Sequence, residues 1–431
     1  MKTKLHLILL VTLSLVWLIL CVDGVAARDW FVRPAGGNYG SEDGSSYQDA
    51  WDGLKSVVWG SGGVDAGDTL YVCGLHLVNQ TPTQSERNWY IGASGTGESS
   101  RIIIRGDCPG DQGIIWGAYI IGGPLNEWTY EGDNTYSTTS GNYNTERFFF
   151  EDVTATSWTL LTKVNSLQEC KDTPGSYYSP TFKYLDPLYV HCSDNGAPTN
   201  RIAANSNGWN IWLSNRQYIT FKNIEFYEPN FGGEGTPVSY IRWEGCKLWY
   251  ASGGILIRNY WHHIEFIDCD RAYGIGGFGF EDYLGNHGED APHHIIVREC
   301  RIHDIGIYRQ NPDAHGIGAN GPDDVTIENN EFYNCGSAIT FYCYPHQTGR
   351  NIIIRWNYIH DMHTIGGATG GGIQLNMDGS NREDKSGGQV YGNIVANIPG
   401  NAYDCSWPED KVNFYNNVAY NCSTSFWFAH T

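Results

Sequence analysis

Residues 325–332 read Val-Thr-Ile-Glu-Asn-Asn-Glu-Phe, and this pattern recurs along the second half of the chain. Apolar residues alternate with polar ones, Asn or Cys follows, and another apolar residue closes the unit; further copies occupy residues 219–226, 295–302, 352–359 and 412–419. Alternating apolar positions over a few residues predict strands, and Gly, Asn and Asp between them predict turns. Each copy is too short to be a domain, so the pattern predicts a repeat architecture.

Aligning the copies produces one column of small or amide side chains. Its members are Ile224, Cys246, Cys269, Cys300, Asn330, Asn357, Asn393 and Asn417, at intervals of 22, 23, 31, 30, 27, 36 and 24 residues. Asn at an inward turn can bond the backbone and its counterparts one coil away, and Cys packs there as a small apolar group. The repeat therefore predicts an all-β, right-handed parallel β-helix whose strands pair with their copies about 4.8 Å away.

The start of the chain has the features of a secretory leader. Lys2 and Lys4 precede an apolar stretch over residues 5–22, and Val25-Ala26-Ala27 offers a small-residue cleavage site. We expect a signal peptide over residues 1–27 and a secreted protein, extracellular or periplasmic, that leaves the membrane after cleavage; an uncleaved anchor is the alternative.

Eleven of the twelve cysteines lie beyond this leader, so at least one has no intramolecular partner. Cys73 and Cys108 end two early strands about one coil apart, which predicts a disulfide between them. We expect Cys269 and Cys300 to be stacked thiols.

The acidic balance limits the partners. The whole chain carries a formal charge of -20, with 47 acidic and 27 basic residues. Such a surface disfavours nucleic acid and anionic membranes, and it repels an acidic polymer unless cations or a basic lining reverse the local sign. The charge could also serve only solubility.

The run from Asp313 to Phe332, followed by Ser337–Phe341, resembles coils of the pectate-lyase-like superfamily. Residues 30–34, 50–51 and 66–72 are similar to the first turn and cap of such proteins. This resemblance implies a carbohydrate-active protein with a polysaccharide partner. We expect a cap over residues 28–75, an elaborated loop region over 124–200 and regular coils over 219–425. The last residues show no cap, so a partner or further residues would cover the open end.

Asp313 and His315 are the strongest catalytic candidates, together with Tyr308 and Arg309 nearby. They lie in an insertion without copies in other coils. Uronate C5-epimerases of this fold carry Asp-Pro-His-Glu, of which Asp313 and His315 match, and polygalacturonase-type hydrolases carry Gly-His-Gly-Ile-Ser, whose core matches residues 315–317. His315 could abstract a C5 proton, Tyr308 could act as acid or base, and Arg309 could neutralise the uronate.

Alternation of the later strands predicts an outward polar strip. We assign substrate binding to His303, Tyr342, Gln374, Asn376 and Asp404, with the sixteen Trp and 28 Tyr as sugar-stacking surfaces or as stacks within the coils. A lyase or epimerase acting on a uronate polymer is the favoured function. The alternatives are a hydrolase pairing Asp313 with Asp304, Asp361 or Asp404, and a noncatalytic binder, since Asp304 shares a turn column with Asn334, Asp361, Asn397 and Asn421.

Neither cofactor nor metal is required by the pattern. Calcium could bind through Asp and Asn oxygens, although no calcium-loop motif is present. The His-His pairs at 262/263 and 293/294 lack accompanying ligands at metal-site spacing, which disfavours zinc.

Overall fold

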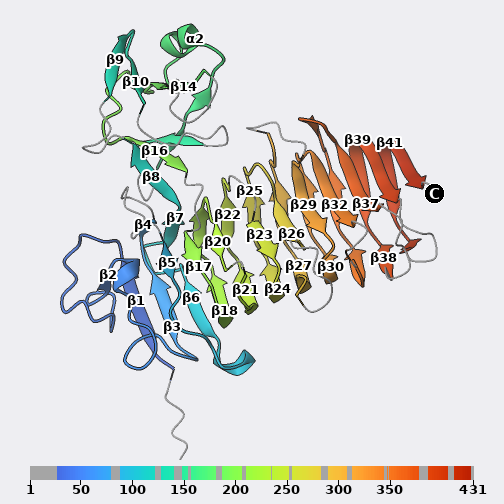
Figure 1. Ribbon diagram of the computed structural model, residues 1–431, viewed down its shortest axis with the longest axis horizontal. Helices are drawn as coiled ribbons and strands as arrows, with labels where there is room; N and C mark the ends of the chain where they lie inside the picture. The colour runs from blue at the N-terminus through green and yellow to red at the C-terminus, as the bar shows by residue number, and fades with distance from the viewer. Residues whose placement is uncertain are drawn as a thin grey trace, which may run out of the picture.

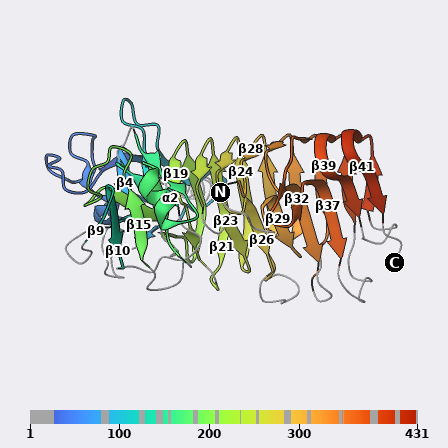
Figure 2. The same ribbon diagram turned by 90° about the horizontal axis from the view of Figure 1, so that it is seen from above.

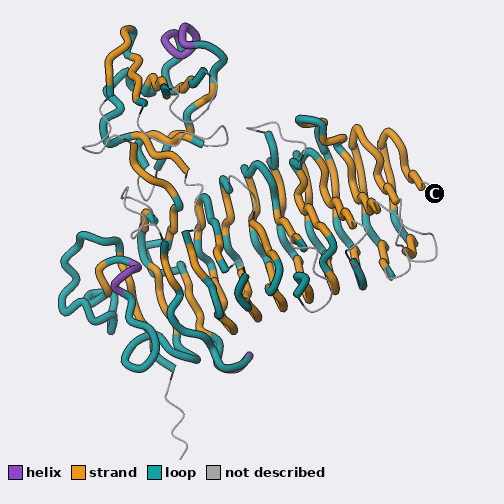
Figure 3. Tube along the Cα trace, in the orientation of Figure 1, coloured by secondary structure: helices purple, strands orange, loops and turns teal. Residues whose placement is uncertain are grey.

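The computed structural model describes residues 27–78, 88–121, 128–139, 148–153, 157–180, 187–205, 210–233, 235–251, 255–282, 290–307, 313–343, 347, 349–377, 387–405 and 412–428. Over these residues the chain winds into a right-handed parallel β-helix, in which strands of successive coils pair side by side along one long axis (Figure 1). Strands and loops recur at the same places coil after coil (Figure 3). The predicted fold is confirmed.

One face of the helix is a long sheet with a strand from nearly every coil. In spatial order its strands are β2 (Trp51–Asp52), β1 (Asp29–Arg33), β3 (Thr69–Val72), β6 (Ile102–Arg105), β18 (Arg216–Lys222), β21 (Val238–Glu244), β24 (Trp261–Ile267), β27 (His293–Arg298), β30 (Asp323–Glu328), β33 (Ile352–Arg355), β38 (Gly388–Tyr391) and β40 (Val412–Tyr415). We call this the first sheet.

The other two faces join at the long strand β39 (Ile394–Cys405). The short-strand face holds β4 (Leu75–Leu77), β7 (Ile114–Trp116), β19 (Glu225–Tyr227), β22 (Lys247–Trp249), β25 (Asp270–Ala272), β28 (Arg301–His303), β31 (Glu331–Tyr333) and β34 (Tyr358–His360). The third face holds β23 (Ile255–Arg258), β26 (Phe278–Glu281), β29 (His315–Asn320), β32 (Ser337–Cys343) and β37 (Gly371–Met377). The last strand, β41 (Val418–Phe428), pairs with β39 and leaves Tyr420 and Trp427 exposed.

Each coil bends at residues in the left-handed region, and these residues also form columns. One column precedes the Cys and Asn column directly, and its φ values at Asn223, Asp268 and Asn329 lie between 51° and 55°. Another follows the short strands and includes Tyr273, Asp304, Asn334, Asp361, Asn397 and Asn421. Because a positive φ costs most non-Gly residues about 1 kcal/mol, Asn and Asp predominate in these columns.

The predicted Asn column is buried and continuous. Asn357 Oδ1 accepts hydrogen bonds from the backbone N and the Nδ2 of Asn330, each at 3.0 Å, and Asn357 Nδ2 donates to Asn393 Oδ1 at 3.0 Å and to Ile327 O at 3.0 Å. Asn417 continues the column beyond Asn393. Each amide thereby satisfies backbone groups at a bend that no strand partner reaches.

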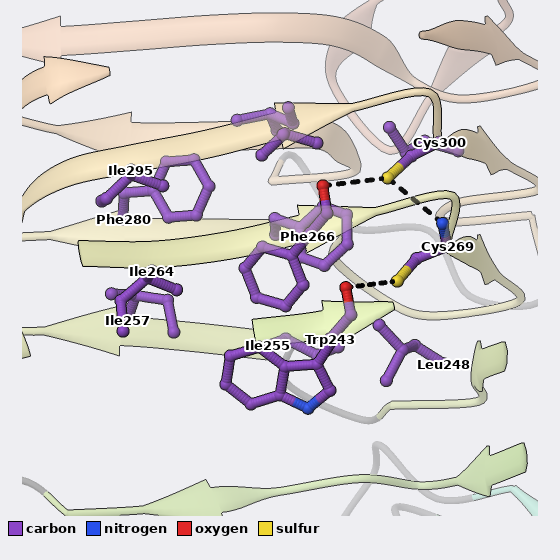
Figure 4. Close-up of a cluster of buried hydrophobic side chains, with 14 of the residues drawn as sticks. Trp243, Leu248, Ile255, Ile257, Ile264, Phe266, Cys269, Phe280, Ile295 and Cys300 are labelled. Carbon is purple, nitrogen blue, oxygen red and sulfur yellow. Dashed lines mark hydrogen bonds between the residues drawn. The ribbon is translucent and has the colours of Figure 1, made fainter. Parts of the chain in front are cut away.

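Towards the N-terminal end the same column consists of thiols. Cys269 Sγ donates to Trp243 O at 3.4 Å, and Cys300 Sγ donates to Phe266 O at 3.5 Å (Figure 4). The rings of Trp243 and Phe266 stack at 4.7 Å beside them. Cys269 and Cys300 are thiols in this structure, and Cys73 is bonded to Cys108, as the sequence predicts.

The described parts of residues 118–205 leave the coils and build two small, mostly antiparallel sheets. They contain β8 (Ala118–Ile121), β9 (Thr129–Gly132), β10 (Thr135–Thr138), β11 (Phe149–Glu151), β12 (Thr159–Leu160), β13 (Thr162–Lys163), α2 (Leu167–Asp172), β14 (Ser176–Tyr178), β15 (Leu188–His191) and β16 (Ile202–Asn205). This excursion stands at the N-terminal end of the coils and has a small core of its own around Phe149, Leu188 and Ile202 (Figures 1 and 2). The short strands β5 (Trp89–Tyr90), β17 (Ile211–Trp212) and β20 (Phe231–Gly232) form a separate three-stranded parallel sheet.

The expected leader falls almost wholly outside the described residues. Among the described residues, no helix has both the length and the apolar character needed to cross a bilayer.

We expect Asn357→Ala to destabilise the protein by about 3 kcal/mol, because it strands Asn330 N–H and Ile327 C=O in a bend from which water is excluded. Asn357→Cys should cost less, since Cys already occupies this column at Cys269 and Cys300. Denaturant unfolding monitored by circular dichroism would measure both.

The matched control is Asn421→Ala. Asn421 donates to Asn397 Oδ1 at 3.0 Å but is exposed, so water can replace that bond. The change should cost only the roughly 1 kcal/mol that Ala loses at this left-handed position. Equal losses for Asn357→Ala and Asn421→Ala would show that the buried column does not stabilise the coils.

Candidate functional site

The third face carries the candidate site on its outer side. Ile317, Ile339 and Ile373 are paired across β29, β32 and β37 and are fully buried in the core. Since side chains alternate along a strand, the next residues face outward. They form two outward columns, Gly318–Thr340–Gln374–Asp404–Trp427 and Asn320–Tyr342–Asn376. Register therefore aligns the residues of the predicted strip, but Thr340 is fully buried and Gln374 and Asp404 are only 9% exposed. The accessible polar part of the strip consists of Asn320, Tyr342 and Asn376.

His315 lies at the start of β29, with its imidazole over Gly318. A Cβ at Gly318 would be 3.4 Å from His315 Cδ2, at van der Waals contact, so the ring lies directly against this position of the strand. The ring centroid is 6.3 Å from that of Tyr342, which is 38% exposed, whereas His315 is 8% exposed. The imidazole is thus held just beneath the surface of the outward strip.

A directed hydrogen-bond chain fixes the orientation of this ring. Thr340 Oγ1 lies 3.1 Å from His315 Nδ1 and donates to Gln374 Oε1 at 3.1 Å. Gln374 Nε2 in turn donates to Thr369 Oγ1 at 3.4 Å, and a Cβ at Gly371 would come within 2.8 Å of that nitrogen. Because the Thr340 hydroxyl has one proton and gives it to Gln374, His315 Nδ1 must be the donor to Thr340. His315 Nε2 then keeps its lone pair.

Burial keeps this histidine neutral. Desolvation lowers the pKa of His315, and the charge of Asp313 opposes that shift only in part. Asp313 is exposed, and its backbone oxygen accepts a hydrogen bond from His315 N at 2.7 Å. A neutral imidazole with a free Nε2 can accept a proton near neutral pH.

Asp404 lies on the same outward column, three strands beyond Gly318. It is 9% exposed; Asn401 Nδ2 donates to its Oδ2 at 3.1 Å, while its Oδ1 is buried without a partner among the described residues. Burial raises the pKa of Asp404, and the bond from Asn401 offsets this only in part. Three strand spacings amount to on the order of 14 Å, so His315 and Asp404 cannot serve one bond together.

His303 belongs to a different face and to a different network. It lies in β28, with Nδ1 2.6 Å from Asp304 Oδ2 and Nε2 2.9 Å from Asp270 Oδ1, and it stacks on Tyr333 at 4.6 Å. Burial alone would lower its pKa, but the two carboxylates outweigh burial and raise the pKa of His303. Its assignment to substrate binding stays a prediction that this geometry does not favour.

Two of the carboxylates considered for a hydrolase are turn residues. Asp304 and Asp361 have φ values of 54° and 49°, and each accepts from the histidine before it. Asn334 Nδ2 also donates to Asp304 Oδ1. The turn conformation and these hydrogen bonds account for the acidic side chains of Asp304 and Asp361 without a catalytic role. Tyr308 and Arg309 lie outside the described residues, so their roles stay predictions.

The sequence interpretation missed a histidine cluster on the first sheet. The statement that the pairs at 262/263 and 293/294 lack accompanying ligands is wrong in three dimensions, because His262 pairs with His293 across β24 and β27. Ligand atoms of His263, His293 and His294 lie within 4.8 Å of one another. The signal was available: the pairs are 31 residues apart, the same interval that separates Cys269 from Cys300.

Comparisons with known proteins extend only to the fold. No family model and no curated protein matches the chain. A solved structure described as a glycoside hydrolase matches with a TM-score of 0.53 and 11% identity, over 92% of this chain and 96% of that one. The complex of XylC with xylose matches with a TM-score of 0.50 and 11% identity, over 90% and 70% of the two chains. Pectate lyase Pel9A has a TM-score of 0.47 at 11% identity, over 94% and 80%. At such identities the first two likenesses show a shared β-helix fold.

We expect His303 and His315 to titrate on opposite sides of the usual histidine pKa of 6.5. Protonation of His303 stabilises the folded protein. This contribution is fully present below the pKa of His303 in the unfolded chain and is lost as pH rises through its pKa in the folded protein. His315 resists protonation, so the folded state loses stability as pH falls below 6.5. An NMR titration of the imidazole resonances would measure both pKa values.

The variants His303→Gln and His315→Gln assign the two resonances. A His315 resonance that titrates above that of His303 would contradict the burial described for His315 and the effect of the two carboxylates on His303.

Proposed function

We propose that the chain is a carbohydrate-active enzyme that holds a polysaccharide along the third face and abstracts the C5 proton of a uronate unit with His315 Nε2. The observation that carries this proposal is the oriented, neutral imidazole beneath an outward polar strip. The proposal includes secretion, as the leader-like start of the sequence suggests.

The shape of the strip suits an extended polymer. Its columns run parallel to the helix axis, so successive sugars would meet equivalent positions on successive strands. Asn320 and Asn376 flank Tyr342 and offer amide groups to sugar hydroxyls, and the exposed rings of Tyr342 and Trp427 offer stacking surfaces. Mixed polar and aromatic lining is typical of carbohydrate sites.

The proposed reaction needs a base on one atom and an acid on another. His315 Nε2 takes the C5 proton, the electron pair of that bond forms the C4–C5 double bond, and the C4–O bond breaks with protonation of the leaving oxygen. Tyr342 is the nearest described phenol, and Tyr308 is the sequence candidate for the acid. An epimerase would instead return a proton to C5 from the other side. Arg309 would neutralise the uronate carboxylate.

Calcium does not fit the described residues of this face. Calcium takes six to eight oxygen ligands, whereas the described strands of this face supply two carboxylates on different columns, Asp404 and Glu281. Glu281 is paired with Arg258 at 3.2 Å. We therefore derive no step through calcium.

Glycoside hydrolysis is the second candidate, and Asp404 favours it. A buried carboxyl with a raised pKa can stay protonated and act as a general acid. The similarly folded proteins include a glycoside hydrolase, although the likeness extends to the fold alone. The described column neighbours of Asp404 are Gln374 and Trp427, neither of which supplies the second carboxylate that hydrolysis requires. A noncatalytic binder would use the same strip without turnover.

We expect His315→Asn to lower turnover of a polyuronate by about a hundredfold or more, because it removes the group to which we assign abstraction of the C5 proton. Incorporation of solvent deuterium at C5 would detect abstraction in both a lyase and an epimerase, and ultraviolet absorbance of an unsaturated product identifies the lyase. Activity should fall as pH drops through the lowered pKa of His315, since protonation removes the base.

His360→Asn is the matched control, because His360 is also a histidine with a tyrosine neighbour but lies in β34 on the short-strand face. Thr340→Val tests positioning and should shift the pH profile as well as the rate. If Asp404→Asn abolishes release of reducing ends while His315→Asn leaves turnover intact, the chain is a hydrolase. If no polysaccharide tested is altered but one binds, it is a binder.

A further inference from the structure

The four histidines of the first sheet converge because two of them have left-handed backbone. In a regular strand neighbouring side chains point to opposite faces. His263 and His294 have φ values of 55° and 54°, and this local bulge turns each ring towards that of the preceding histidine. The Nδ1 atoms of His262 and His263 lie 2.7 Å apart, and those of His293 and His294 lie 2.6 Å apart.

Parallel register then stacks one pair on the other. The rings of His262 and His293 are 5.0 Å apart with an interplanar angle of 3°, and those of His263 and His294 are 4.4 Å apart at 10°. Four imidazoles from β24 and β27 thus form a two-by-two array, and the column above it continues with the stacked ring of Tyr240 at 4.3 Å.

Carboxylates border the array on the open side. Asp324, in the next strand β30, has its Oδ2 3.6 Å from His294 Nδ1, while its Oδ1 accepts from Asn351 Nδ2 at 2.7 Å. A hollow of about 520 Å³ lies over this part of the sheet and is lined by His263, Glu265, His294 and Asp324 among others. The array therefore faces an accessible groove.

We propose that His263, His293 and His294 bind one divalent transition-metal ion of the zinc class on the outer surface of the first sheet, with Asp324 placed as a fourth ligand. Imidazole nitrogens and a carboxylate are ligands that zinc, copper and nickel accept, whereas calcium and magnesium prefer oxygen alone.

The array requires little adjustment to take the ion. Two nitrogens bound tetrahedrally at about 2.05 Å from zinc are roughly 3.3 Å apart, so the Nδ1 atoms of His293 and His294, now 2.6 Å apart, would separate by about 0.7 Å. Rotation of partly exposed side chains can supply this movement. The hydrogen bond within a neutral pair ends when the donor ring moves its proton to Nε2, so the rings bind metal without net proton release.

The electrostatics of the array favour a cation over protons. Burial and the neighbouring imidazoles lower the pKa values of His263 and His293, which leaves both rings neutral at pH 7. Glu265, Asp323 and Asp324 supply negative charge nearby, partly offset by Arg242 on Glu265 and Arg350 on Asp323. The ion would also join two coils whose ligands are about 31 residues apart in sequence.

Zinc titration of the chelator-treated full chain tests the proposal by calorimetry at pH 7.5, with cobalt absorbance as a second readout of nitrogen ligation. We expect one zinc ion per chain, an increase in Tm on binding, and at least a hundredfold weaker binding in the double variant His263→Gln/His294→Gln. Asp324→Asn should weaken binding by about tenfold.

His360→Gln is the control, because its neighbouring rings are Tyr333 and Tyr358, and no second imidazole stacks on it among the described residues. It should bind zinc as the unaltered chain does. Circular dichroism checks that each variant is folded. Absence of zinc binding to the unaltered chain, or equal binding by the folded double variant, overturns the proposal; neither result depends on any activity towards polysaccharides.

Discussion

The constraint on which this molecule depends is that every coil must bend at the same place as its neighbours. Parallel strands give hydrogen bonds only in register, and a bend that slipped by one residue would turn the inward side chains outward. Left-handed residues such as Asn223, Asp268 and Asn329 fix the bend, and the buried column beside them satisfies the backbone groups that the bend exposes. Loop length is then free to vary, which explains why intervals from 22 to 36 residues coexist with an unbroken register.

The same register explains the composition of the surfaces. A residue on one strand touches its counterpart on the next, so favourable pairs become ladders: Tyr218 on Tyr240, Tyr240 on His263, His263 on His294. Opposite charges also face each other on adjacent strands, as Arg242 and Glu265 do at 3.0 Å. Many of the aromatic residues that suggested sugar stacking serve these ladders instead, while Tyr342 and Trp427 remain exposed on the third face.

Sequence alone predicted the features that repeat. The buried column from Cys246 to Asn417, the disulfide between Cys73 and Cys108, and the outward order of Thr340, Gln374 and Asp404 follow from aligned spacing, since one alignment fixes all equivalent positions. The tautomer of His315 could not be predicted, because it depends on which hydroxyl and amide meet across β32 and β37. The histidine array was missed because its ligands are neighbours only after a whole coil has been wound.

The change from thiols to amides along the buried column has a consequence for how the coils come apart. Around Cys246 and Cys269 the interior is filled by stacked rings of Phe221, Trp243 and Phe266, whereas from Asn330 onward amide bonds accompany aliphatic Ile327, Ile354 and Val390. A solenoid's stability is a sum over nearest neighbours, so these two segments need not share one melting behaviour. Hydrophobic burial dominates the aromatic segment, and its stabilising effect weakens on cooling. The amide segment depends on hydrogen bonds that water can replace once neighbouring strands open. Unfolding that spreads through the amide segment towards the N-terminus would therefore slow where the column becomes sulfur.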